Sequence, residues 1–213
     1  MGSKYSVLMS VYHKEKPEYL KQAIESIQAQ TLQTDDFVLV CDGPLNPELD
    51  AVIAAKQQEM GNTLNVVRLA KNGGLGNALN EGIKHCKNEL VARMDSDDIS
   101  HYDRCEKQLA VFNTRPKVSI CSGIVEEFTT SPEIVDARRV PPETNAEIVE
   151  FAKERTPFNH PCVMYKKSAV EAAGSYQDFY LLEDYYLWLR MLMAGYQGYN
   201  IQEPLLHMRA GSE

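Results

Sequence analysis

The feature that most constrains this fold is a regular alternation of short apolar runs with amphipathic segments over the first 128 residues. The apolar runs predict strands, which we place at 5–12, 36–43, 64–70, 89–95 and 117–128. Apolar residues at helical spacing predict helices between them, at 17–30, 46–60, 74–86 and 102–114. Strands that alternate with helices form βαβ units, so the sequence predicts an α/β fold: a mostly parallel sheet flanked by helices.

The pattern changes after residue 128. Residues 129–146 are polar and contain three of the ten prolines, which predicts a surface loop or flap. Beyond it we expect a helix at 146–155, a strand with a short helix at 157–176, and a helix at 182–196. No internal repeat interrupts the chain, so we expect one domain over residues 1–213.

The charge of the chain limits its partners. The formal net charge is −8, and nonspecific binding of nucleic acid requires a basic surface, so we expect no nucleic-acid partner. A small ligand that carries phosphate is compatible with this charge if a cation or a local cluster of donors offsets it. No run of about 18 apolar residues predicts a helix that spans a membrane.

Five widely spaced cysteines without a Cys-x-x-Cys pair argue against a disulfide framework and a zinc site. We therefore expect reduced, mostly buried thiols and a cytoplasmic protein. The sequence ends at "HMRAGSE" without a structural stop signal, which is compatible with a longer natural protein.

The segment "VARMDSDD", residues 91–98, places three carboxylates within four residues after a predicted strand. One Asp would suffice to cap a following helix, and three exceed that need. Asp95, Asp97 and Asp98 thus favour a divalent-cation site of hard oxygen ligands, with helix capping as the alternative. In parallel sheets ligands bind at the carboxyl ends of strands, where Tyr12 and Asp42 are also expected.

Three further features have a functional and a structural interpretation. The glycine-rich segment 71–82 leads into a helix, so its backbone N–H groups could face an anion, although the pattern alone is a weak signal. Glu183 and Asp184 begin a predicted helix, where they either complement its dipole or include a general base. The group Tyr180, Tyr185 and Tyr186 either lines an acceptor groove or packs in the core.

In their order and spacing, these pieces resemble the family 2 glycosyltransferases with the GT-A fold. The resemblance covers nearly the whole chain and rests on the following segments: "SVLMSVYHKEKPEYLKQAIESIQAQT", "VCDGP", "NGGLGNALNEG", "ARMDSDD", "NHPCVMYKKSAV", "EDYYLWLRM" and "EPLLHMR". It implies an inverting enzyme that moves a sugar from a nucleotide-diphosphate sugar, UDP-linked in our expectation, to a hydroxyl of a saccharide or lipid-linked saccharide. It also implies a nucleotide-sugar half at about 1–115 and an acceptor half at about 116–213.

The resemblance assigns roles to individual residues. Asp97, with Asp95, would hold Mg²⁺ or Mn²⁺ between the donor phosphates, and Asp95 would also hold the ribose or a water ligand. Val11 and Tyr12 would contact the nucleotide base, and Asp42 would accept a hydrogen bond from that base. Asn72 and Gly73 would help to frame the nucleotide. Asp184 would be the catalytic base, with Glu183 oriented toward the acceptor and His160 on the acceptor side.

One departure and two alternatives accompany the resemblance. Family members often carry a histidine near the position of Gly211, and some bind the metal with it, so the third protein ligand is unassigned here. A haloacid-dehalogenase-like phosphatase also uses Asp-x-Asp at a strand end, and a nucleotide-sugar-binding module could keep the fold without turnover. Relatives that build surface polysaccharides act at the inner face of the membrane, which is compatible with peripheral membrane association.

Overall fold

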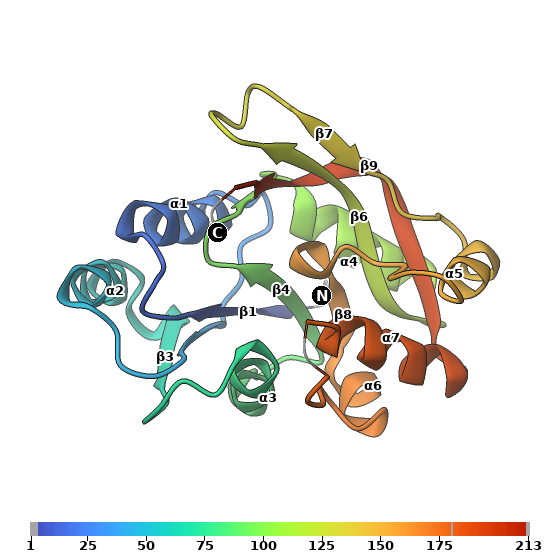
Figure 1. The fold of residues 1–213 in the computed structure, drawn as a ribbon, viewed down its shortest axis with the longest axis horizontal. Coiled ribbons are helices and arrows are strands. Elements are labelled where there is room, and N and C mark those ends of the chain that lie inside the picture. The colour runs from blue at the N-terminus through green and yellow to red at the C-terminus, as the bar shows by residue number, and fades with distance from the viewer. Residues whose placement is uncertain (1–3, 180, 212–213) are drawn as a thin grey trace.

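The first part of the sheet is parallel, with the strand order β3–β2–β1–β4. Its strands are β1 (Tyr5–Val11), β2 (Phe37–Cys41), β3 (Leu64–Arg68) and β4 (Leu90–Asp95). This arrangement comes from a computed structural model, which describes residues 4–179 and 181–211 (Figure 1). In the register, Val7 lies opposite both Phe37 and Ala92, so β1 is central and buried on both faces. The strands predicted for this part of the chain are confirmed.

The second part of the sheet is mixed. Strand β8 (Met164–Lys166) runs antiparallel to β4 and to β6 (Val118–Phe128), and β9 (Gln197–Arg209) runs parallel to β6. Two short strands complete it: β5 (Ile99–Ser100), antiparallel to β9, and β7 (Ala137–Arg139), antiparallel to β6. The sequence did not predict β9, because Gln202, Glu203 and Pro204 interrupt its apolar pattern where its register with β6 shifts.

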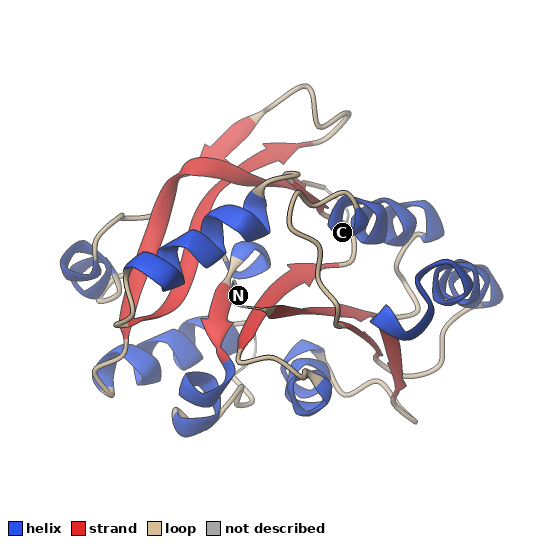
Figure 2. Cartoon of the chain, turned by 180° about the vertical axis from the view of Figure 1, so that it is seen from behind, coloured by secondary structure: helices blue, strands red, loops and turns tan. Residues whose placement is uncertain are grey.

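Helices cover both faces of the sheet (Figures 1 and 2). One face carries α1 (Pro17–Gln28), α2 (Pro47–Met60) and α4 (Arg104–Thr114), and the other α3 (Leu75–His85), α5 (Asn145–Phe151), α6 (Lys167–Ala172) and α7 (Glu183–Met193). Two short 3₁₀ helices lie at Gly61–Thr63 and His160–Cys162. Because side chains alternate along a strand, Val7 and Met9 pack with the first set of helices and Leu8 with the second.

Local sequence explains where the helices begin and how closely they pack. Asn46 caps α2, since its side-chain oxygen accepts a hydrogen bond from the Leu49 N–H at 2.8 Å. On the buried side of α1 lie Leu20, Ala23, Ile24 and Ile27. Gly82 lets α3 approach the sheet, because a Cβ there would lie 2.3 Å from Leu8 Cδ1.

The predicted flap at 129–146 is only partly a loop. Its middle forms β7, and its end is fixed to β9 through the Asn200 side chain, which donates to the Pro142 carbonyl at 2.6 Å. The Asn200 backbone N–H donates to the Glu143 carbonyl at 3.0 Å. Pairing with a strand that the sequence did not reveal thus orders a polar, proline-containing segment.

All five cysteines are buried and free, as the sequence predicted. Burial raises the pKa of the Cys41 thiol to about 11, so this thiol is protonated and unreactive at neutral pH. Among the described residues, no helix combines the length and apolar character that crossing a membrane requires.

Candidate active site

A pocket of about 500 Å³ opens at the carboxyl edge of the parallel strands. Most of the predicted nucleotide and metal residues line it: Val11, Tyr12, Asp42, Asn72, Asp95 and Asp97. They come from segments far apart in sequence, which meet because β1, β2 and β4 are neighbours and end at the same edge. The topology therefore gathers the polar strand ends as the sequence predicted.

The structure shows how three crowded carboxylates are accommodated. Asp95 is paired with the buried Arg93, whose guanidinium donates to both of its oxygens, one bond measuring 2.9 Å. Asp98 turns inward and accepts the backbone N–H of Arg209 at 3.0 Å. Asp97 lies between them, half-buried, and lines the pocket. The three carboxylates thus have different surroundings, and Asp95 and Asp97 remain at the pocket.

The inward carboxylate is the most perturbed of the three. Burial raises the pKa of Asp98 well above its usual range, and the charges of Asp95 and Asp97 raise it further. The backbone N–H of Arg209 and the charge of Arg93 oppose this increase in pKa. Asp98 therefore acts here as a buried partner of β9, which leaves Asp95 and Asp97 at the pocket as candidates for the predicted cation site.

The glycine-rich loop binds a carboxylate of this chain. The N–H groups of Gly73 and Gly74 donate to the two oxygens of Asp42, at 2.8 and 3.0 Å. Gly43 allows this contact, because its φ is +86° and a Cβ would lie 2.5 Å from the Asn72 nitrogen. These two N–H groups are therefore committed to Asp42. Gly73 itself does not line the pocket, whereas Asn72 and Gly74 do.

Part of the pocket wall comes from residues that were not predicted from the sequence pattern. Lys14, Glu15 and Lys16, in the loop after β1, line it together with Tyr19. Glu15 is fixed by the Ser96 hydroxyl, which donates to its carboxylate at 2.6 Å. A signal for these residues was present in "HKEKP", where charged residues directly follow a strand end. The two lysines add positive charge to a pocket that otherwise contains several carboxylates.

Glu183 and Asp184 lie in the first turn of α7, which packs against the first turn of α3. A Cβ at Gly76 would be 3.7 Å from Glu183 Cγ, and the neighbouring Leu75 lines the pocket. Burial raises the pKa of Asp184, while the Tyr185 backbone N–H and the Arg93 charge lower it. A carboxylate with a raised pKa is a better proton acceptor, which suits a general base.

His160 is half-buried beside aromatic side chains of the core. Its Nε2 is 3.0 Å from the Tyr176 hydroxyl, and its ring meets the edge of the Trp188 ring at 5.8 Å. Burial lowers the pKa of His160 well below its usual range, with a further contribution from Arg93, so the imidazole is neutral at neutral pH. Its neighbour Asn159, which the sequence did not single out, joins β6 to β7 by donating to the carbonyls of Gly123 and Arg139.

Tyr185 and Tyr186, on α7, contact other parts of this chain. The Tyr185 hydroxyl donates to the Ala152 carbonyl at 2.6 Å, and Tyr186 lies between the Phe179 ring and the Arg190 guanidinium. Tyr180 lies outside the described residues. These contacts favour the predicted alternative of packing for Tyr185 and Tyr186.

The fold is shared with solved structures of S. aureus TarS. The crystal structure of S. aureus TarS 1–349 superposes with a TM-score of 0.70 at 19% identity, and a second one contains UDP-GlcNAc. The match covers 97% of this chain and 60% of the TarS chain, so this chain spans less than two thirds of that protein. At this identity, the likeness shows the fold alone.

Sequence comparison shows the family. The model of "Glycosyl transferase family 2" matches residues 6–174. The amylovoran biosynthesis glycosyltransferase AmsE of Erwinia amylovora is 43% identical over 98% of this chain and 77% of its own length. A UDP-Gal:α-D-GlcNAc-diphosphoundecaprenol β-1,3-galactosyltransferase of Escherichia coli is 40% identical over 99% of this chain and 75% of its own length. These matches exclude the phosphatase alternative, and the chain belongs to glycosyl transferase family 2.

Proposed function

We propose that this protein transfers a sugar from a UDP-sugar to a hydroxyl of a lipid-linked saccharide during the synthesis of a cell-surface polysaccharide, with inversion at the anomeric carbon. The E. coli relative is named for a UDP-galactose donor and a diphosphoundecaprenol acceptor, and AmsE for amylovoran synthesis. A TarS structure contains UDP-GlcNAc. These printed names of related proteins are the basis for the donor class, the acceptor class and the pathway that we propose.

The observation that carries the proposal is an arrangement of two kinds of carboxylate, one lining the pocket and one on a helix that packs against the pocket wall. Neither Glu183 nor Asp184 lines the pocket itself. Asp95 and Asp97 line it from the end of β4. Asp184, with a raised pKa, lies on α7 against the first turn of α3, which also contributes to the pocket wall. An inverting transfer requires one group at the leaving diphosphate and another at the attacking hydroxyl. The first half of the chain would thus hold the donor and the second half the base.

The donor would be held by the residues at the strand ends. We assign contacts with the nucleotide base to Val11 and to Tyr12, a residue that is 43% exposed. Asn72 and the loop that Asp42 fixes would frame the nucleotide. Because the Gly73 N–H is already bound to Asp42, Gly73 would act through the loop rather than by contact. Lys14 and Lys16 would offset the negative charge of the diphosphate, so a protein with a negative net charge could still bind a ligand that carries phosphate.

The site also fits the divalent cation that the family implies. Each oxygen of Asp95 accepts one bond from Arg93 and keeps a lone pair, and Asp97 adds a second hard carboxylate. We propose that Asp97 and Asp95 hold Mg²⁺ or Mn²⁺. When bound, the cation acts as a Lewis acid that stabilises negative charge on the leaving diphosphate. Gly211 stands near the position where relatives carry a histidine, so donor oxygens and water would complete the shell.

The acceptor side is assigned to the start of α7. We propose that Asp184 removes the proton of the acceptor hydroxyl and that Glu183, beside it, orients the acceptor. His160 would be neutral and would position Tyr176 through their 3.0 Å contact, without transferring a proton itself. The absence of a spanning helix among the described residues is compatible with the proposal of a cytoplasmic protein at the inner face of the membrane.

The test is a thermal-shift screen of nucleotide-diphosphate sugars with Mn²⁺, followed by calorimetry with and without a chelator. A ligand present at 100 times its Kd stabilises a protein by about 2.7 kcal/mol, which such a screen detects. We expect a UDP-sugar to give the largest shift, the chelator to weaken binding, and Asp97→Asn to weaken it similarly. Asp103→Asn, an acidic residue outside the pocket, is the matched control. Equal affinity with and without chelator would refute the role of the cation.

A further inference from the structure

A second group of metal-ligand side chains lies outside the pocket described above. It comprises His101, which follows β5, Glu126 on β6 and His207 on β9, and one ligand atom of each lies within 4.8 Å of the others. Strand pairing brings them together: His207 lies opposite Glu126 in β6 and opposite Ile99 in β5. The group joins three segments that are separate in sequence and that a stable core already positions.

The two oxygens of the Glu126 carboxylate have different partners: one is paired with an arginine, and the other faces two histidine rings. Its Oε1 accepts two bonds from Arg138, at 3.0 and 2.7 Å. Its Oε2 is 3.5 Å from His101 Nε2 and also 3.5 Å from His207 Nδ1. Both nitrogens are buried, and neither makes a hydrogen bond within the described part of the chain. Two imidazoles therefore direct nitrogens toward one carboxylate oxygen at a distance that is long for a hydrogen bond.

These distances suit ligands that share one ion. Two ligand atoms about 2.0–2.1 Å from a tetrahedral Zn²⁺ are about 3.3–3.4 Å apart. A neutral imidazole carries a lone pair on one ring nitrogen, which it can give to a cation. The negative charges of Asp103, beside His101, and Glu133, beside His207, favour a cation here, and Lys107 opposes it.

We propose that His101, Glu126 and His207 form a site for a borderline divalent cation such as Zn²⁺, with water as the fourth ligand. Two imidazole nitrogens and one carboxylate oxygen are a ligand set that Zn²⁺ prefers, whereas Mg²⁺ and Mn²⁺ prefer oxygen. The two rings are stacked, with centroids 4.2 Å apart and 24° between their planes. Binding therefore requires the rings to turn until both lone pairs converge, and the stack opens.

The ion would connect Glu126, where β6 pairs with β7, to His207 on β9 and to His101, which follows the aspartate cluster. The pairing of β5 with β9 and the backbone bond from His101 N–H to the Leu205 carbonyl, 3.0 Å long, already place His101 beside β9, and the ion would add a third connection. None of the three proposed ligands lines the pocket that contains Asp97. The proposal thus predicts a structural ion that is independent of the catalytic one.

The test uses Co²⁺ as a visible stand-in for Zn²⁺. The chain is stripped with a chelator and titrated with Co²⁺, and calorimetry with Zn²⁺ runs in parallel. Tetrahedral Co²⁺ bound by imidazole absorbs strongly in the visible, whereas Co²⁺ in an octahedral oxygen site absorbs weakly. We expect one equivalent of strongly absorbing Co²⁺, displaced by Zn²⁺, and a calorimetric Zn²⁺ site that is lost in His101→Gln and His207→Gln.

Two controls separate this site from other sources of binding. Asp97→Asn should keep the strong absorbance, which distinguishes the site from the proposed catalytic one. His85→Gln changes an exposed histidine at the end of α3 and should also keep it. The proposal is overturned if the wild-type chain shows no strong absorbance, if the absorbance survives in the double variant His101→Gln/His207→Gln, or if it is lost in Asp97→Asn. A wild-type chain without strong absorbance overturns the proposal whether or not the variants fold.

Discussion

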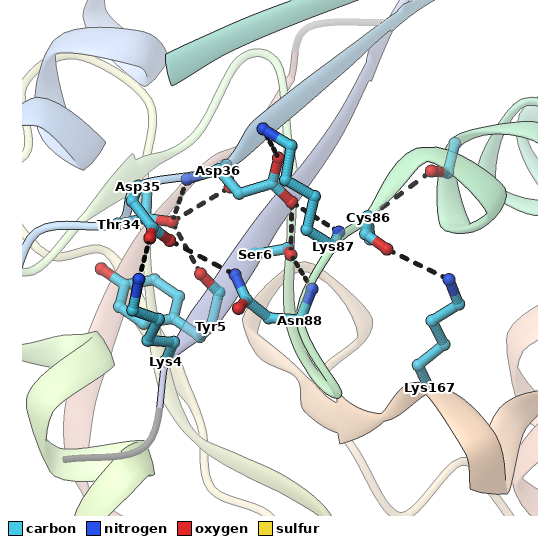
Figure 3. A network of polar contacts seen from close by, with 11 residues as sticks. Lys4, Tyr5, Ser6, Thr34, Asp35, Asp36, Cys86, Lys87, Asn88 and Lys167 are labelled. Carbon is cyan, nitrogen blue, oxygen red and sulfur yellow. Dashed lines mark hydrogen bonds and ion pairs between the residues drawn. The ribbon is translucent and has the colours of Figure 1, made fainter. Parts of the chain in front are cut away.

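The two edges of the parallel sheet both contain buried or half-buried aspartates, and they use them differently. At the amino edge, Asp36 precedes β2 and is fully buried, and its Oδ2 accepts the Ser6 hydroxyl at 2.6 Å and the Lys87 N–H at 2.8 Å (Figure 3). Lys87 Nζ is 3.3 Å from Oδ1. At the carboxyl edge, Asp95 and Asp97 line an open pocket.

The difference is in what remains available to a ligand. At the amino edge, donors from this chain surround the carboxylate, and Ser6 in turn accepts the Asn88 N–H at 3.0 Å (Figure 3). A buried polar group with protein partners of this kind stabilises the fold. At the carboxyl edge, Asp95 keeps lone pairs beyond its pair with Arg93 and faces space. An aspartate is thus structural or functional according to its partners, and the substitutions below test that assignment.

The largest effect is expected at Asp184. In Asp184→Asn the side chain keeps its shape but no longer accepts a proton, so transfer should fall by roughly 10²–10⁴-fold, the usual worth of a general base. Donor affinity should be unchanged, because the residue lies on the acceptor side. Transfer is measured with a UDP-sugar and a saccharide acceptor, and donor binding by calorimetry. Unchanged transfer would remove this mechanism, and the alternative of a binding module predicts no transfer even in the wild-type protein.

The next effect is on stability. Asp36→Ala leaves the Ser6 hydroxyl and the Lys87 N–H without their buried acceptor, and each such loss costs about 1–3 kcal/mol. We expect denaturant unfolding to show a loss of about 2–4 kcal/mol, with donor affinity of the folded protein unchanged.

The neighbouring Asp35 provides the matched control. Its side chain is 55% exposed and pairs with Lys4 at the surface, so Asp35→Ala should cost less than about 1 kcal/mol. If both substitutions cost the same, or if Asp36→Ala weakens donor binding more than stability, the contrast between the two edges fails.

The sequence predicted the carboxyl edge better than the amino edge. Asp42, Asp95 and Asp97 follow apolar runs directly, and the βαβ pattern alone places such positions together. Asp36 also adjoins an apolar run, but its partners Ser6 and Lys87 are 30 and 51 residues away, and no local pattern indicates them. Periodicity reveals elements and their ends, whereas hydrogen bonds between distant segments appear only in the structure.

The same limit explains what was missed elsewhere. β9 has an interrupted pattern and is a strand because β6 pairs with it, so tertiary pairing overrides local sequence. Arg93 reads as one charge in an apolar run, and its pairing with Asp95 depends on a buried position that the sequence alone does not establish. The glycine segment suggested an external anion because nothing local shows that Asp42 reaches it.

A smaller effect is expected from Asp42, which both fixes a loop of this chain and lines the pocket. Its two oxygens bind the N–H groups of Gly73 and Gly74, and it also lines the pocket. Asp42→Asn replaces one acceptor oxygen with an amide NH₂, so one of the two bonds is lost and the loop loosens. We expect donor affinity to fall roughly tenfold, or about 1.4 kcal/mol, as measured by calorimetry. A change in stability without a change in affinity would make Asp42 structural, like Asp36.

The smallest effect concerns the pH at which Asp184 loses its proton. Because burial raises the pKa of Asp184, kcat/KM should be full above this pKa and fall as pH drops through it, at a pH above the ordinary range of an aspartate. The Glu183 charge also raises the pKa of Asp184, so Glu183→Gln should move this acid limb to lower pH. The position of the limb, unlike the rate itself, is independent of how well Glu183 orients the acceptor. A limb that does not move in Glu183→Gln, or one that lies in the ordinary aspartate range, would show that a different group controls the proton transfer.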